Sequence, residues 1–264
     1  MHFLDHLEAL RWHLVRSAIA IVAFALLAFL NKEILFDQII LGAKDPGFLT
    51  YRVLCQLSDR FGVDMCIREV PFILINIDIS GQFTTHIYVS FIAGFILGFP
   101  YLLWELWRFI KPALSKKELN YSRGIVFFSS LLFMSGVLFG YYIISPLSIN
   151  FLGSYQISSQ VANQITLNSF ISTVTMLTLS SGVVFELPIV IYFLSKIGIV
   201  TPSFLRTYRR HAMVIILIVA AIITPSPDIS SQILVAIPLF ILYEISIGVS
   251  AMVLRNRERD AASR

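Results

Sequence analysis

The apolar residues of this 264-residue chain come in long blocks separated by short polar segments. Such blocks are apolar on every face, unlike the one-sided stripe of a helix on a soluble protein, and they indicate elements surrounded by lipid. About 20 helical residues, rising about 1.5 Å each, cross about 30 Å of hydrocarbon. The pattern predicts six membrane-spanning helices, at residues 15–36, 87–109, 122–144, 168–195, 211–224 and 230–254.

The last two predicted spans are short. The uninterrupted apolar run of the fifth covers residues 212–223, which makes about 18 Å of helix. A "TPSPD" turn closes the pair at one end, and "RRH" at residues 209–211 bounds it at the other. Helices this short thin the bilayer, draw in water or lean on longer neighbours, and the alternative is that polar end residues are dragged slightly inward. We predict local thinning.

Composition supports a membrane protein. Hydrophobic residues make up 57% of the chain and charged residues 14%, whereas charged residues form about 25% of a typical soluble domain. The first apolar stretch resembles a secretory signal, but no small-residue cleavage site follows it, so we expect an uncleaved first span. We therefore predict an all-α integral membrane protein whose residues 1–264 form a single six-span domain. The formal charge of +4 does not indicate a nucleic-acid partner.

The distribution of basic residues predicts the orientation, because cytoplasmic loops are rich in Lys and Arg. Alternate connections carry these residues, and the opposite ones, "SPLSINFLGSYQISSQVANQ" and "TPSPD", contain none. Both termini are therefore expected in the cytoplasm, with residues 1–14 as a cytoplasmic N-terminal helix and 255–264 as a cytoplasmic tail. The basic residues at the predicted cytoplasmic ends include Arg11, Arg16, Arg108, Lys111, Lys116, Lys117, Arg123, Lys196, Arg206, Arg209, Arg210, Arg255, Arg257, Arg259 and Arg264.

The first outer loop, residues 37–80, is too long for a simple connector. Apolar residues recur at helical spacing from Leu49 to Phe61, and Gly62 is placed to end that helix. "FILINIDIS" then alternates with period two, as a half-buried strand does. We expect a structured extracytoplasmic cap. Cys55 and Cys66 both lie in it, and outside the cytoplasm either a disulfide or two unpaired thiols are open to them.

Glu186 lies inside the apolar run "GVVFELPIVIYFL" of the fourth span. It is roughly nine residues, or about 13 Å, from the cytoplasmic end. An acid at that depth costs at least about 2.5 kcal/mol, so it must be protonated, paired within the bundle or facing water. Pro188 lacks an amide proton and is expected to kink the helix beside the acid. Intramembrane acids are functional by default, and the alternative is a protonated structural glutamate bonded to a neighbouring helix.

Four stretches in order on this six-span frame resemble the TatC component of the twin-arginine protein translocase: "FLDHLEALR", "LWELWRFIKPALSKKE", "VVFELP" and "ITPSPDISSQILVAIPLFILYEI". The resemblance implies a receptor, not an enzyme and without cofactor or metal, in the bacterial cytoplasmic (inner) membrane. It implies binding of twin-arginine signal peptides at the cytoplasmic face. It also implies self-association, assembly with TatA- and TatB-type single-span proteins, and export of folded precursors driven by the proton-motive force.

The resemblance assigns roles to individual residues. Ala9 stands where the family's N-terminal motif usually has a second glutamate, and Asp5, four residues earlier, shares its helical face. We take Glu118 as the main remaining carboxylate, with Glu8 or Asp5 assisting. The residues implied in signal-peptide binding are Glu118, Phe109, Glu8, Asp5 and Arg11. Those implied in intramembrane polar or partner contacts are Glu186, Gln232, Asp228 and Glu244.

Two other classes of membrane protein, a secondary transporter and an intramembrane protease, have features that can be sought in the sequence. Glu186 and Glu244 are plausible proton sites of an ion-coupled secondary transporter, but the hydropathy shows no internal repeat. An intramembrane protease needs a nucleophile with a base, or a metal set. The five histidines lie at span ends or in loops and no H-E-x-x-H occurs, so we predict no catalytic residues.

Overall fold

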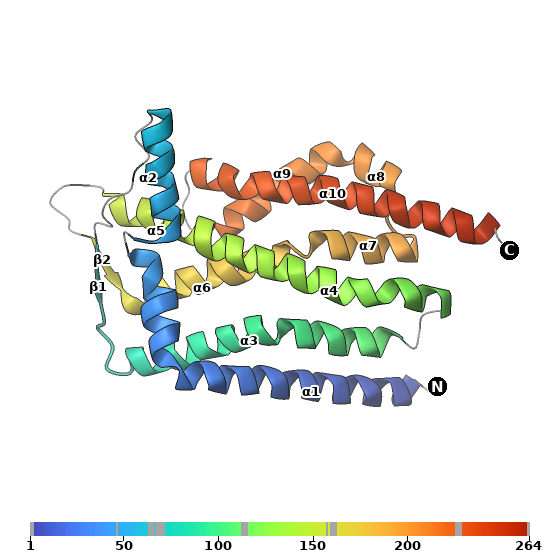
Figure 1. Cartoon of the computed structure of the whole chain (residues 1–264), viewed down its shortest axis with the longest axis horizontal. Coiled ribbons are helices and arrows are strands. Elements are labelled where there is room, and N and C mark those ends of the chain that lie inside the picture. The colour runs from blue at the N-terminus through green and yellow to red at the C-terminus, as the bar shows by residue number, and fades with distance from the viewer. Residues whose placement is uncertain are drawn as a thin grey trace.

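In the computed structural model, long helices lie side by side along one axis, and the chain begins and ends at the same end of the bundle (Figure 1). We call this the terminal end and the opposite one the cap end. The structure describes residues 3–45, 47–62, 66, 72–111, 116–156, 158, 163–224 and 229–262. Two chain ends on one side agree with an even number of crossings.

Five helical segments of the described chain are long and apolar enough to cross a membrane: Glu8–Leu30, Gly81–Ile110, Gly124–Ser154, Leu167–Ile197 and Gln232–Arg255. They correspond to the predicted first, second, third, fourth and sixth spans. The prediction of an all-helical membrane protein is confirmed.

The first span is shorter than predicted at its outer end. Helix α1 (Phe3–Leu30) runs unbroken from the expected N-terminal helix through the span. Asn31 then donates a side-chain hydrogen bond of 2.7 Å to the carbonyl of Leu27. The chain continues as η1 (Ile34–Ile40) and η2 (Leu41–Lys44). The apolar block was assigned to the span as far as residue 36, but Leu35 is buried in the core beneath the cap, where it needs no lipid.

The second to fourth spans contain two interruptions. Helix α3 (Gly81–Ile110) is continuous, whereas the third span consists of α4 (Lys116–Phe139), the π-helical η4 (Gly140–Ile144) and α5 (Ser145–Ser154). It passes residue 144, its predicted end, because Pro146 lies at the start of α5, where proline is tolerated. The fourth span is α6 (Leu167–Val184) followed by α7 (Leu187–Ile197), with the break beside Pro188 that the sequence predicts.

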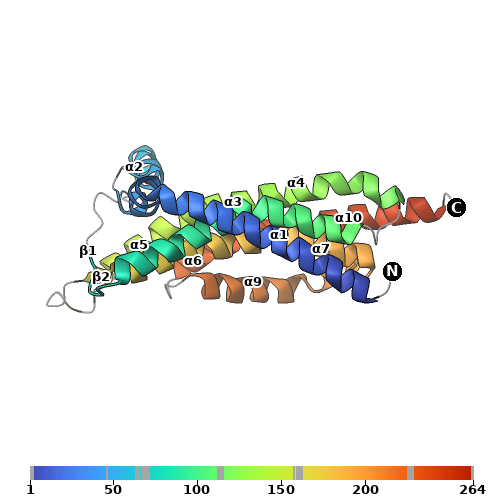
Figure 2. The same cartoon turned by 90° about the horizontal axis from the view of Figure 1, so that it is seen from below.

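The last two spans differ in length. Helix α9 (Arg209–Ile223), which follows the short α8 (Pro202–Thr207), has 15 residues and covers about 22 Å. It packs along α10 (Ile229–Ala262), which has 34 residues (Figures 1 and 2). The prediction of two short final helices is therefore wrong for α10, because its apolar segment, Gln232–Arg255, already has 24 residues and the helix continues beyond it into the charged tail. Any thinning of the bilayer depends on α9 alone.

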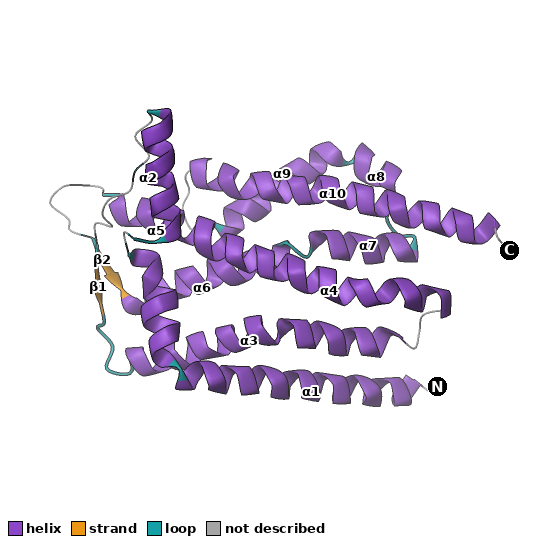
Figure 3. Cartoon of the chain, viewed as in Figure 1, coloured by secondary structure: helices purple, strands orange, loops and turns teal. Residues whose placement is uncertain are grey.

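The cap is built from the first two outer loops (Figure 3). Helix α2 (Leu49–Phe61) ends at Gly62, whose φ of 66° is left-handed, as the glycine predicted. Strand β1 (Ile73–Ile75) pairs in parallel with β2 (Gln164–Thr166) from the loop before α6, with Leu74 opposite Ile165. The strand expected over "FILINIDIS" is only three residues long, because β2 offers partners to these three.

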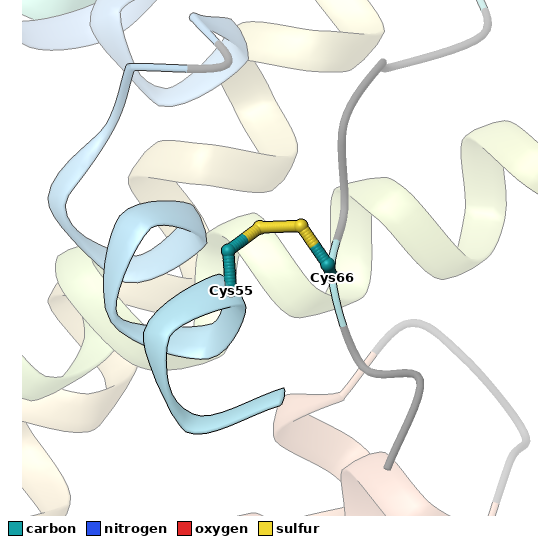
Figure 4. Close-up of a disulfide and its surroundings, with 2 residues drawn as sticks. All are labelled: Cys55 and Cys66. Atoms are coloured by element: carbon teal, nitrogen blue, oxygen red, sulfur yellow. A yellow bond between two sulfur atoms is a disulfide. The ribbon is translucent and has the colours of Figure 1, made fainter. Parts of the chain in front are cut away.

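Cys55 and Cys66 form a disulfide, which is one of the two alternatives that the sequence left open (Figure 4). Their Cα atoms are 4.2 Å apart, and the bond joins α2 to the segment that leads to β1. It closes a loop with a sequence separation of 11 residues. A short cap with little core of its own gains stability from such a link.

The burial of Tyr51 predicts that the cap loses stability at high pH. The side chain is fully buried, and its hydroxyl donates to the carbonyls of Ala43 (3.2 Å) and Pro146 (3.3 Å). Burial raises the pKa of Tyr51 from 10.0 to about 12. Because the folded cap holds the protonated phenol, this contribution to stability is fully present below pH 10 and is lost as the pH rises toward 12.

The measurement is an ultraviolet difference titration of the whole chain minus Tyr51→Phe. The difference reports the Tyr51 phenol alone. We expect this phenol to ionise close to pH 12, together with loss of cap structure. A difference signal that titrates at pH 10 without unfolding would contradict the buried, hydrogen-bonded hydroxyl.

Helices α4 and α6 approach closely through small residues. Gly136 on α4 and Gly140 at the start of η4 lie one turn apart, a spacing that lets membrane helices bring their backbones together. A Cβ atom on Gly140 would lie 2.8 Å from the Cβ of Ser181 and 2.9 Å from the carbonyl oxygen of Leu177. The contact fixes the middle of the bundle, where Glu186 lies.

Candidate functional site

A buried acid joins α1 and α3 at the terminal end. Glu105 is 1% exposed, and one of its oxygens, Oε2, is hydrogen-bonded and ion-paired with Nδ1 of His13. The other oxygen, Oε1, accepts from the Tyr101 hydroxyl at 3.0 Å and from the Arg108 guanidinium at 3.3 Å. Three donors from two helices therefore satisfy the carboxylate, which otherwise would be costly to bury.

Aromatic rings border this cluster. The Arg108 guanidinium lies 4.8 Å from the ring centre of Trp104, which leaves half of the arginine side chain exposed. The ring of Phe109 meets the ring of His13 edge-on, with centroids 6.0 Å apart. The terminal end of α3 thus combines a carboxylate with an aromatic face, which is the chemistry that binds guanidinium groups.

The residues expected to bind a signal peptide lie around the same end. Phe109 is half-buried against α1, and Glu8 and Arg11 are exposed on α1. Glu118 lies in the first turn of α4 and Asp5 in the first turn of α1, but both side chains lie outside the described part. The structure therefore brings Phe109 to the α1–α3 contact and leaves the roles of the expected carboxylates as predictions.

Glu186 lies at the break between α6 and α7. The chain bends there because Glu186 caps α7, with its carbonyl accepting from the amide of Ile189 at 3.0 Å. The Ser129 hydroxyl on α4 donates to Oε2 of Glu186 at 2.6 Å. Oε1 is buried and has no hydrogen-bond partner among the described residues. The acid is thus paired within the bundle, with one acceptor left over.

The other expected polar contacts tie α9 to α10. The Gln232 side-chain amide donates to the carbonyl of Leu217 at 3.0 Å, and Glu244 forms an ion pair of 2.6 Å with Arg209. Asp228 lies outside the described residues. Gln232 and Glu244 stand three turns apart on α10, so the structure does not gather the expected intramembrane residues into one site.

An apolar cavity of about 500 Å³ lies between α1, η1, α3, α4 and α6. Leu27, Val89, Tyr141 and Thr178 are among its lining residues, and Glu186 is not. Within the described residues, no cluster of three His, Cys, Asp or Glu side chains could hold a metal ion.

Sequence reasoning missed Glu105 and His13. The signal was present, because Glu105 is an acid inside a predicted span, with Tyr101 four residues before it and Arg108 three residues after it. Such spacings place the three side chains on one helical face. The partner on α1 could not be predicted, since it depends on how the two helices cross.

The comparisons with known proteins decide the family. Residues 5–238 match the family described as "Sec-independent protein translocase protein (TatC)". The chain belongs to the TatC family. It is 42% identical over 262 residues to the TatC of Blattabacterium sp. subsp. Periplaneta americana (strain BPLAN), covering 97% of each chain. It is 34% identical over 259 residues to the TatC of Aquifex aeolicus, covering 98% of each.

Solved TatC structures have the same fold. A crystal structure of a TatC in the detergent DDM, titled as a twin-arginine translocase receptor, has 34% sequence identity and a TM-score of 0.70, covering 93% of this chain and 99% of that one. A second TatC crystal structure gives a TM-score of 0.65 at 33% identity, covering 94% and 99%. The chain is therefore a multi-pass membrane component of the bacterial Tat system, a transport protein and not an enzyme. The alternative of a secondary transporter is wrong.

Proposed function

We propose that this TatC-family chain is the receptor that binds twin-arginine signal peptides at its terminal end. That end faces the cytoplasm in our proposal, with the chain in the bacterial cytoplasmic membrane. The observation that carries the proposal is the contact between α3 and α1, where the buried Glu105 carboxylate holds the half-exposed Arg108 guanidinium beside the aromatic ring of Trp104 and the ring of Phe109 packs on α1. Its partners are precursor proteins, TatA- and TatB-type single-span proteins and further copies of itself, with export driven by the proton-motive force.

Recognition of two arginines fits this chemistry. A guanidinium presents a planar fork of donors that a carboxylate accepts in pairs, whereas lysine offers a point charge. An exposed ion pair contributes only about 0–1 kcal/mol, but a charged hydrogen bond at a partly desolvated surface contributes about 1.5–3 kcal/mol. Two such bonds separate a twin-arginine peptide from a random basic peptide by about a hundredfold or more.

The prediction for the expected carboxylates concerns peptide affinity. Glu118→Ala should weaken binding of a twin-arginine peptide about tenfold, because one charged hydrogen bond is lost, and Ala9→Glu should tighten it by a similar factor. Fluorescence anisotropy with the purified chain in nanodiscs measures both. A matched twin-lysine peptide is the control and should bind weakly to all three proteins. If neither substitution changes twin-arginine affinity, the assignment of these positions fails.

A further inference from the structure

We propose that Trp104 and Glu105 form a guanidinium-binding subsite, that Arg108 of the same chain occupies it at rest, and that an arginine of the incoming signal peptide takes its place. The inference rests on the proposed receptor function and adds a named subsite to it. The resting arginine acts as an internal competitor that sets the affinity.

The structure already holds a guanidinium in this place. Arg108 donates from Nη1 to Oε1 of Glu105 at 3.3 Å, and its guanidinium carbon lies 4.8 Å from the ring centre of Trp104. The carboxylate accepts a hydrogen bond from the guanidinium, and the aromatic ring makes a cation–π contact with it. The arrangement favours arginine over lysine, because a planar guanidinium can present several donors in a fixed fork whereas an ammonium group is a compact point charge.

The resting contact is easy to exchange. Arg108 and Glu105 are three residues apart on one helix, and the arginine side chain is 44% exposed, so the pair gains little over water. Trp104 is 45% exposed, so the ring that Arg108 covers at rest also lies at the surface. The acid is 1% exposed with Arg108 in place, whereas the arginine that contacts its Oε1 is itself largely accessible to solvent. A peptide arginine can follow the same approach when Arg108 swings away.

The acid itself stays in position during the exchange. His13 holds Oε2 from α1, and the Tyr101 hydroxyl holds Oε1 from the turn below, so neither contact depends on Arg108. Only the mobile member of the cluster is replaced, and the receptor needs no rearrangement of its helices.

The experiment measures affinity for a twin-arginine and a matched twin-lysine peptide with the full chain in nanodiscs. Arg108→Gln should tighten twin-arginine binding about threefold to fivefold, because the internal competitor is gone. Glu105→Gln keeps one acceptor oxygen, puts an NH2 donor in the place of the other and removes the negative charge, so it should weaken binding about tenfold or more. Arg255→Gln removes one exposed positive charge elsewhere at the terminal end and is the matched control, with affinity unchanged.

Wild-type discrimination between the two peptides tests the receptor function separately. If the wild-type chain prefers twin-arginine but Arg108→Gln binds no tighter than Arg255→Gln, the subsite is wrong and the receptor function stands. If the wild-type chain does not discriminate, the receptor function fails. If Glu105→Gln does not fold, as judged by its thermal unfolding midpoint, the comparison of Arg108→Gln with Arg255→Gln decides alone.

Discussion

Gly140→Leu, at the junction of α4 and η4, is expected to push these helices away from α6 and to lower the free energy of unfolding by about 3 kcal/mol. The first side-chain atom would already lie 2.9 Å from the Leu177 carbonyl oxygen and from the Cα of Thr178. Backbone atoms cannot rotate away as the end of a flexible side chain can, so the helices themselves must move. Equilibrium unfolding of the purified chain in detergent measures the loss, and export of a twin-arginine precursor should fall with it.

Gly248→Leu is the matched control. Gly248 is an exposed glycine in the middle of α10, and a Cβ atom there would meet nothing within 4 Å. The substitution adds the same side chain on a membrane helix without a clash, so unfolding should change by less than about 0.5 kcal/mol. Equal losses in both variants would show that leucine is harmful at any helical glycine and would contradict the close packing of α4 on α6.

The topology of the bundle could be predicted from the sequence, and its local boundaries could not. Apolar blocks and basic loops are properties of each segment alone. The sequence therefore predicted that these segments are membrane-spanning helices. Where a span ends depends on neighbours: Leu35 and Ile40, which follow the polar segment 31–33, are buried under the cap and not in lipid, and α10 continues because its polar tail stays helical. The pairing of β1 with β2 joins segments about 90 residues apart and leaves no local pattern.

In the candidate site, too, features of a single segment could be predicted and contacts between helices could not. Glu186 stood out because an acid in a long apolar run has a cost that composition alone reveals. Glu105 did not, because it lies near a span end, where an acid can reach water, and its burial depends on His13 from another helix. A satisfied cross-helix contact requires the crossing geometry of both helices, and one sequence does not contain that information.

Loss of the Ser129 hydroxyl, which donates to Glu186, is expected to destabilise the bundle. Ser129→Ala takes away the hydroxyl that donates to Oε2 at 2.6 Å, and Oε1 has no other partner in the described chain. The buried carboxyl then loses a hydrogen bond without regaining water, which should cost about 1–3 kcal/mol of unfolding free energy. Combining Ser129→Ala with Glu186→Leu makes both positions apolar, so much of this loss should return. Unfolding of the two single variants and the double variant, read as a double-mutant cycle, measures the coupling.

Export by the same variants separates a structural glutamate from a functional one. If Glu186 only filled space, the double variant would be stable and would export a twin-arginine precursor at the wild-type rate. We expect export to fall at least about tenfold despite the recovered stability. The buried oxygen Oε1 is an acceptor that the described part of the chain leaves unused, and a guest peptide or partner helix can use it. Full export by a stable double variant would assign the acid to packing alone. The bond to Ser129 then would account for its presence at that depth.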